Sequence, residues 1–103
     1  MVIINLGKKV SGKELEKVLL EAAKNLGFKT KIQEDFRVKY ELGSVKKKII
    51  YDGTTITLRK HFRYIGRLFF NREEDRDWLI LFDHPSYSEK KIMRYLDAIS
   101  EKI

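Results

Sequence analysis

Alternation of apolar and charged residues between positions 28 and 42 constrains the fold more than any other feature of the sequence. The segments FKTKIQ (28–33) and FRVKYEL (36–42) place an apolar side chain or a threonine at every second position, with charged or amide side chains between them. A period of two residues is typical of a strand with one face on a core and the other in water. The two segments therefore predict two strands of an antiparallel sheet.

Two short turn signals extend the predicted sheet beyond residue 42. GS at 43–44 suits a two-residue turn, and DG at 52–53 is a strong hairpin signal because both turn residues need positive φ. Turns at these places pair Val38 with Ile49 and Ile49 with Ile56, so apolar side chains meet across neighbouring strands. A slip of one residue would break both sets of pairs, which favours this register.

This register assigns each residue of the predicted strands to one of two faces. Lys47 and Lys60 fall on the core face, and we interpret them as long side chains whose charged ends reach water at the sheet margin. We expect Phe62 to point inward as well, which leaves the outer face almost without aromatic residues. The core face is predicted to hold Phe36, Val38, Tyr40, Leu42, Val45, Ile49, Tyr51, Ile56 and Leu58, and the outer face Lys29, Lys31, Arg37, Lys39, Glu41, Lys46, Lys48, Thr55, Thr57, Arg59, His61 and Arg63.

Helices are predicted on either side of this strand region. Ser11 and Glu14 have the spacing of a capping box, and a 3.6-residue apolar period follows them until Gly27, which suits a helix C-terminus. This pattern predicts a helix over residues 12–26. Ser86 and Glu89 repeat the capping-box spacing ahead of a second apolar period, so we expect another helix near the C-terminus.

Three further strands are expected, and two of them raise the question of what covers them. Residues 2–6 form a short apolar run, and residues 67–71 and 77–82 are apolar at consecutive positions, so both faces of these strands need cover. The cover is either the rest of the same chain or a second subunit, because exposed apolar patches mark interfaces. The candidate interface residues are Leu68, Phe69, Phe70, Trp78, Leu79, Ile80 and Leu81.

The order of these elements predicts the fold class. A chain of 103 residues without a linker, repeat or low-complexity tract is expected to form one domain over residues 1–103. We expect an α+β fold with a mostly antiparallel sheet of six to seven strands and two helices on one face, in the order β-α-β(5–6)-α. In this order of elements the chain is similar to the TATA-binding-protein-like and helix-grip architectures, a resemblance that implies a fold but no function.

Positive charge is concentrated in the predicted strand region. The chain has a net charge of +7, and residues 28–63 hold ten Lys and Arg residues against four Asp and Glu residues. Three interpretations remain open: an ordinary solvated sheet face, a surface that binds nucleic-acid phosphates, or a contact with an acidic protein. Abundant Lys, Glu and Ile without Cys is also a bias of heat-adapted proteins. The candidate binding residues are Lys29, Lys31, Arg37, Lys39, Lys46, Lys48, Arg59 and Arg63.

Patterns typical of catalysis, metal binding or cofactor binding are not found in the sequence. It has no cysteine, and its two histidines, His61 and His84, have no metal-ligand spacing. We interpret His84 as a loop residue rather than a ligand, and the acids at 73–77 as a solvated turn rather than a cation site. We therefore expect no enzyme activity, no metal and no cofactor.

These patterns together suggest a non-enzymatic role. We expect a small binding or assembly domain with a basic sheet face, which associates with itself through residues 68–82. The alternative is a protein that binds nucleic acid without sequence specificity. The missing cysteines and the absence of a long apolar segment predict a cytoplasmic protein without a membrane partner.

Overall fold

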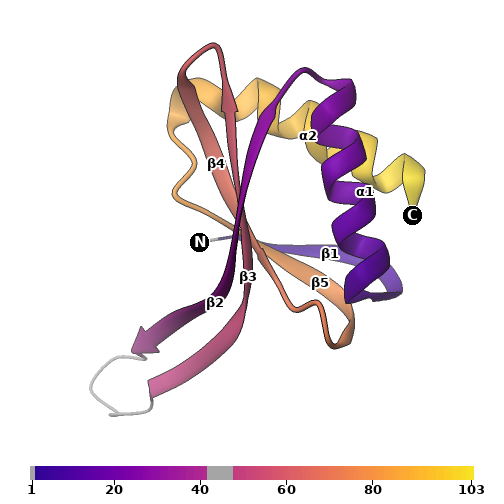
Figure 1. Cartoon of the computed structure of the whole chain (residues 1–103), viewed down its shortest axis with the longest axis vertical. Coiled ribbons are helices and arrows are strands. Elements are labelled where there is room, and N and C mark those ends of the chain that lie inside the picture. Colours follow the sequence, from indigo (N-terminus) through magenta and orange to yellow (C-terminus); the bar gives the residue numbers. More distant parts are fainter. Residues whose placement is uncertain (1, 42–47) are drawn as a thin grey trace.

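The computed structural model describes residues 2–41 and 48–103, with side chains described for residues 2–34 and 53–103. It has the expected α+β class, with one antiparallel sheet of five strands and two helices (Figure 1). The elements are β1 (Val2–Ser11), α1 (Gly12–Asn25), β2 (Lys29–Glu41), β3 (Lys48–Lys60), β4 (Arg63–Phe70), β5 (Asp75–Phe82), a short 3-10 helix η1 (Ser86–Ser88) and α2 (Glu89–Lys102).

The strands lie in the order β1-β5-β4-β3-β2, and all neighbouring pairs are antiparallel. Strands β2 to β5 therefore follow one another across the sheet, whereas β1 pairs with β5 at the far edge. Helix α1 carries the chain from one edge of the sheet to the other. Figure 1 shows α1 and α2 on the same side of the sheet, so one sheet face packs on helices and the other does not.

The first helix begins and ends where the sequence predicts. The Ser11 hydroxyl accepts a hydrogen bond from the backbone N–H of Glu14 at 3.1 Å, and Gly27 follows the helix with a φ of 75°. The second cap is different. Ser86 begins η1 instead of capping α2, and the hydroxyl of Ser88 donates to the Ile65 carbonyl at 2.7 Å. The predicted cap at Ser86 is therefore wrong.

The main core lies between the two helices and one face of the sheet. Its helical residues include Leu15, Leu19 and Ile92, and its strand residues are Val10, Ile56, Leu58, Ile65, Leu68, Phe70, Leu79 and Leu81. Tyr95 is fully buried there, and its hydroxyl donates to the Leu19 carbonyl at 2.8 Å. This hydrogen bond joins α2 to α1, and burial raises the pKa of the Tyr95 hydroxyl.

The predicted count of six to seven strands is wrong because two of the predicted breaks lie inside continuous strands. Strand β2 runs through residues 34–35 with a register shift between Gln33 and Phe36, and β3 runs through the predicted turn at 52–53. A Cβ added to Gly53 would lie 2.7 Å from the ring of Phe69 and 2.5 Å from the carbonyl oxygen of Phe70. Gly53 therefore permits close packing against β4 and does not make a turn.

The predicted register changes with the turn. Val38 pairs with Tyr51 instead of Ile49, a shift of two residues. Because β3 is continuous through residues 52–53, the register positions of Ile49 and Tyr51 alternate with those of Ile56 and Leu58, so the prediction that all four share the core face is wrong. The same holds for the register positions of Phe36, Val38 and Tyr40, which lie opposite residues 53, 51 and 49. The predicted pair of Ile49 with Ile56 is wrong because both residues belong to β3. The predicted turn at 43–44 lies outside the described residues.

Candidate functional site

The sheet face opposite the helices is organised in rows by the strand register. Ile56 and Leu58 of β3 pack in the main core, so the alternate residues Thr55, Thr57 and Arg59 face the other way. Their cross-strand partners share this open face. One row is Lys29, Arg59 and Tyr64; the next is Lys31, Thr57, Arg67 and Phe82; a third is Gln33, Thr55, Phe69, Ile80 and Ile3.

Aromatic side chains lie beside the arginines on this face. The guanidinium carbon of Arg59 is 5.6 Å from the ring centroid of Tyr64, and that of Arg67 is 5.1 Å from the ring centroid of Phe82. These are cation–π distances. The expectation of a nearly aromatic-free outer face is therefore wrong. Tyr64 lies on the open face because the β3–β4 turn and the adjacent register shift place it directly opposite Arg59.

The β3–β4 turn consists of His61 and Phe62, because Lys60 pairs with Arg63 on either side of it. His61 has a φ of 50° and Phe62 a φ of 66°, and positive φ at both central residues is the requirement of a type I′ hairpin turn. Phe62 is 97% exposed, so the prediction that it points inward is wrong. The alternation of β3 ends at the turn, and a turn residue belongs to neither face.

Arg63 lies on the other side of the hairpin from Arg59. Its partner in the register is Lys60, which faces the helices, so the assignment of Arg63 to the outer face is wrong. The guanidinium carbon of Arg63 is 5.2 Å from the ring centroid of Tyr87 in η1. Tyr87 is half-exposed, and its hydroxyl donates to the Tyr64 carbonyl at 2.8 Å, which holds the ring beside the hairpin.

Lys60 lies on the helix side of the sheet, as the sequence predicts, but its charged end binds a carbonyl rather than simply reaching water. Its ammonium donates to the carbonyl oxygen of Leu26 at 3.2 Å and lies 5.7 Å from the ring centroid of Phe28. A lysine in this position satisfies a carbonyl at the C-terminus of α1 and interacts favourably with the helix dipole. Lys60 thus fixes the hairpin to α1. Lys47 lies outside the described residues.

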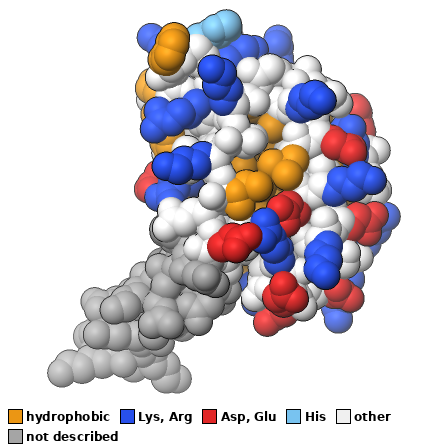
Figure 2. All heavy atoms as spheres, viewed as in Figure 1, with side chains coloured by type: hydrophobic (Ala, Val, Ile, Leu, Met, Phe, Trp, Pro, Cys, Tyr) orange, Lys and Arg blue, Asp and Glu red, His pale blue; other side chains and the backbone are white. Residues whose placement is uncertain are grey.

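We refer to Lys29, Arg59, His61, Phe62, Arg63, Tyr64 and Tyr87 as the hairpin end. The ammonium of Lys29 is 5.9 Å from the ring centroid of Phe62, so a cation lies beside the exposed ring. In Figure 2 Lys and Arg side chains cover the part of the molecule that holds the β3–β4 turn, whereas most Asp and Glu side chains lie around α1 and toward the other end. Burial, and secondly Asp83, raise the pKa of the Tyr64 hydroxyl.

The remaining predicted binding residues are divided between described and undescribed parts of the chain. Lys31 is exposed on the open face and pairs with Thr57. The backbones of Arg37, Lys39 and Lys48 belong to β2 and β3, but their side chains are outside the described set. Lys46 lies outside the described residues altogether. The structure therefore brings together Lys29, Lys31 and Arg59 on one face, with Arg63 round the turn.

The candidate interface residues are covered by the chain itself. Leu68, Phe70, Leu79 and Leu81 belong to the main core, while Phe69 and Ile80 pair with each other on the open face and are also buried. Only Trp78 is half-buried, with the Arg76 guanidinium carbon 4.4 Å from its ring centroid. Self-association stays a prediction, and six of these seven side chains offer no surface for it.

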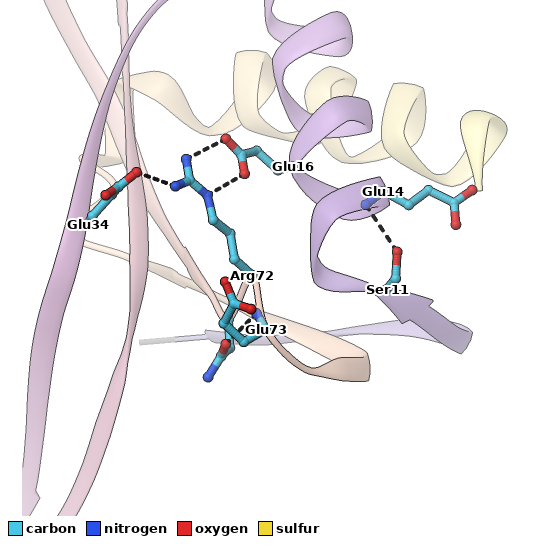
Figure 3. A network of polar contacts seen from close by, with 7 residues as sticks. Ser11, Glu14, Glu16, Glu34, Arg72 and Glu73 are labelled. Carbon is cyan, nitrogen blue, oxygen red and sulfur yellow. Dashed lines mark hydrogen bonds and ion pairs between the residues drawn. The ribbon is translucent and has the colours of Figure 1, made fainter.

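The charged segment between β4 and β5 is engaged in structural ion pairs. Arg72 forms two hydrogen bonds with Glu16 of α1 and one with Glu34 of β2 (Figure 3). At the start of β5, Arg76 pairs with Glu74 at 2.6 Å. Within the described ranges, no group of three or more acidic or histidine residues could hold a metal ion. No helix in these ranges is both long and apolar enough to cross a membrane.

Comparison with known protein families, curated proteins and solved structures finds no match to this chain. Its function is therefore inferred from the residues of the hairpin end and the adjoining open face.

Proposed function

We propose that this chain is a non-enzymatic binding domain that holds the phosphate backbone of nucleic acid, without sequence specificity, through the hairpin end and the adjoining open face. The observation that carries the proposal is the direct cross-strand pairing of Lys29 with Arg59, with Lys31 in the next row. Like charges placed opposite each other destabilise a sheet. A partner that brings negative charge removes this repulsion.

Phosphate binding explains the chemistry of these side chains. Lys29, Lys31, Arg59 and Arg63 are all exposed, and no ion pair is found for any of them in the part of the chain with described side chains. Their charge is available to phosphates, in contrast to Arg72 and Arg76. Lys and Arg side chains that neutralise phosphates release condensed counterions, and this release drives binding.

Self-association through the apolar residues of β4 and β5 is not part of this proposal, since nearly all of them are buried within one chain. An acidic protein surface is the competing partner. We favour nucleic acid because Lys29 and Lys31 occupy neighbouring rows of the same face of β2, so two cations lie in line along one strand. A cytoplasmic location belongs to the same proposal.

Salt-dependent binding to oligonucleotides tests the proposal. We expect about four phosphate contacts to lower the affinity for a single strand roughly 50-fold between 50 mM and 200 mM salt, given a slope of about −0.7 per contact. The double substitution Lys29→Glu with Arg59→Glu should abolish binding. No binding of the wild-type protein at 50 mM salt would contradict the proposal.

A matched control separates local charge from net charge. Lys13→Glu with Lys17→Glu changes the net charge equally, and both lysines are exposed on the N-terminal half of α1. We expect this control to retain most of the affinity. An equal loss in the control and in the hairpin-end variant would show that only the overall charge of the protein matters.

A further inference from the structure

The β3–β4 turn carries a side chain that the fold does not need there. Type I′ turns favour Asn-Gly or Asp-Gly because both central residues have positive φ, yet this turn is His61-Phe62. Phe62 is 97% exposed, so its ring gains almost no packing that would offset the strained backbone. Single exposed hydrophobic residues are common on protein surfaces. An exposed hydrophobic residue with a left-handed backbone conformation at a hairpin tip is uncommon. Strained backbone of this kind is found at ligand-binding sites.

The surroundings of Phe62 are cationic and aromatic. The Lys29 ammonium lies 5.9 Å from its ring centroid, and the neighbouring Arg63 lies against the half-exposed ring of Tyr87. Val2, Ile3 and Met93, which are also exposed, belong to β1 and α2 rather than to this turn. An apolar pocket or a lipid surface would favour further apolar residues around the tip. Cations beside accessible rings are what an unpaired base with its flanking phosphates requires.

We infer that Phe62 stacks on an unpaired base while Lys29 and Arg63 hold the adjacent phosphates, which makes the domain selective for single-stranded nucleic acid. The inference rests on the proposed function and adds the class of ligand. Tyr87 offers a second ring on the far side of Arg63, held in place by its hydrogen bond to the Tyr64 carbonyl. In a duplex the faces of the bases are covered by their neighbours, so Phe62 would have no ring to stack on.

Binding to strands with and without bases tests the inference. The probes are oligodeoxythymidylate of about 20 nucleotides, which exceeds the site of a small domain, an abasic strand of the same length and a duplex of the same length. We expect the wild-type protein to prefer the strand with bases over the abasic strand roughly 5- to 150-fold, the effect of one stacked base. Phe62→Ala should remove this preference and leave affinity for the abasic strand unchanged. Phe62→Trp should retain it.

Controls separate this inference from the proposed function. Met93→Ala removes another exposed hydrophobic side chain, on α2, and should change neither affinity. Circular dichroism should show that all variants are folded. Equal wild-type affinity for the base-containing and abasic strands would overturn the inference and leave the proposed function standing, whereas no binding to any strand would overturn both.

Anionic lipid vesicles test the alternative that Phe62 contacts a membrane surface rather than a base. Vesicles of phosphatidylserine and phosphatidylcholine should bind the wild-type protein no better than they bind Phe62→Ala. If Phe62→Ala lowers binding to vesicles while leaving oligonucleotide binding unchanged, Phe62 contacts a membrane surface and the inference is overturned.

Discussion

The guanidinium of Arg72 forms a two-point ion pair with the carboxylate of Glu16, with Nε at 2.5 Å from Oε2 and Nη2 at 2.6 Å from Oε1. Its remaining nitrogen, Nη1, donates to Glu34 of β2 (Figure 3). One side chain in the β4–β5 connection thus contacts both α1 and β2. This geometry matches the planar fork of arginine to a carboxylate, and the two hydrogen bonds to Glu16 raise the pKa of Arg72 further.

We expect Arg72→Ala to lower the free energy of unfolding by about 1–2 kcal/mol, because Glu16 is mostly buried and loses its partner. Arg72→Lys should restore only part of the loss, since an ammonium cannot form the two-point pair. Lys102→Ala is the control: Lys102 and Glu21 are 3.6 Å apart and more exposed, so the loss should stay below about 0.5 kcal/mol. Urea unfolding measures all three. Equal losses for Arg72→Ala and Lys102→Ala would contradict the expectation.

Gly12 should tolerate no side chain. A Cβ at this position would lie 2.0 Å from the carbonyl oxygen of Asn71, a backbone atom that cannot move away easily. We expect Gly12→Ala to destabilise the protein by about 2–3 kcal/mol. Gly7→Ala is the matched comparison, because Gly7 has a φ of 80° but no atom near the added Cβ, so only the conformational cost of about 1 kcal/mol applies. Thermal unfolding that ranks Gly7→Ala as the worse variant would contradict the packing at Gly12.

The hairpin tip should show a trade between stability and binding. Replacing His61 and Phe62 by Asn and Gly installs the residues that a type I′ turn favours. We expect a gain of about 1 kcal/mol, seen as a Tm higher by roughly 4–8 °C. The same variant should lose the preference for strands with bases. A lower Tm would show that the wild-type turn is not strained.

Tyr95 should make the stability depend on pH in the alkaline range. Burial raises its pKa above the ordinary value of 10, so the unfolded chain loses the proton at a lower pH than the folded chain does. The stabilisation is therefore complete below pH 10 and is lost as the pH rises above 10, by at most about 1.4 kcal/mol per pH unit. Tyr95→Phe should cost about 1 kcal/mol at pH 7, because the hydrogen bond to Leu19 is lost. It should also flatten the dependence above pH 10; an unchanged slope would exclude Tyr95 as the source.

The hairpin end could be predicted from the sequence only in part. The positive charge of residues 28–63 and the outward direction of Lys29, Lys31 and Arg59 follow from composition and alternation, and the structure bears out these positions. The exposure of Phe62 could not be derived in this way, because DG at 52–53 was the stronger turn signal. A weak signal was present nonetheless: the turn His61-Phe62 lies between the paired cations Lys60 and Arg63, where the alternation of the strand stops.

The sequence by itself determined the α+β class and the bounds of α1, because a helix cap and an alternating strand depend on residues that are close together in the chain. Ser11 and Glu14 are three residues apart, and their hydrogen bond forms as predicted. Only the tertiary structure decided how many strands the sheet has and which residues occupy its turns. A glycine such as Gly53 is suited both to a turn and to a position packed against an aromatic ring. Phe69 and Phe70 of β4 approach Gly53 closely, so it occupies a packed strand position and not a turn. That contact moves the turn to His61 and Phe62 and leaves an aromatic ring exposed at the end of the hairpin.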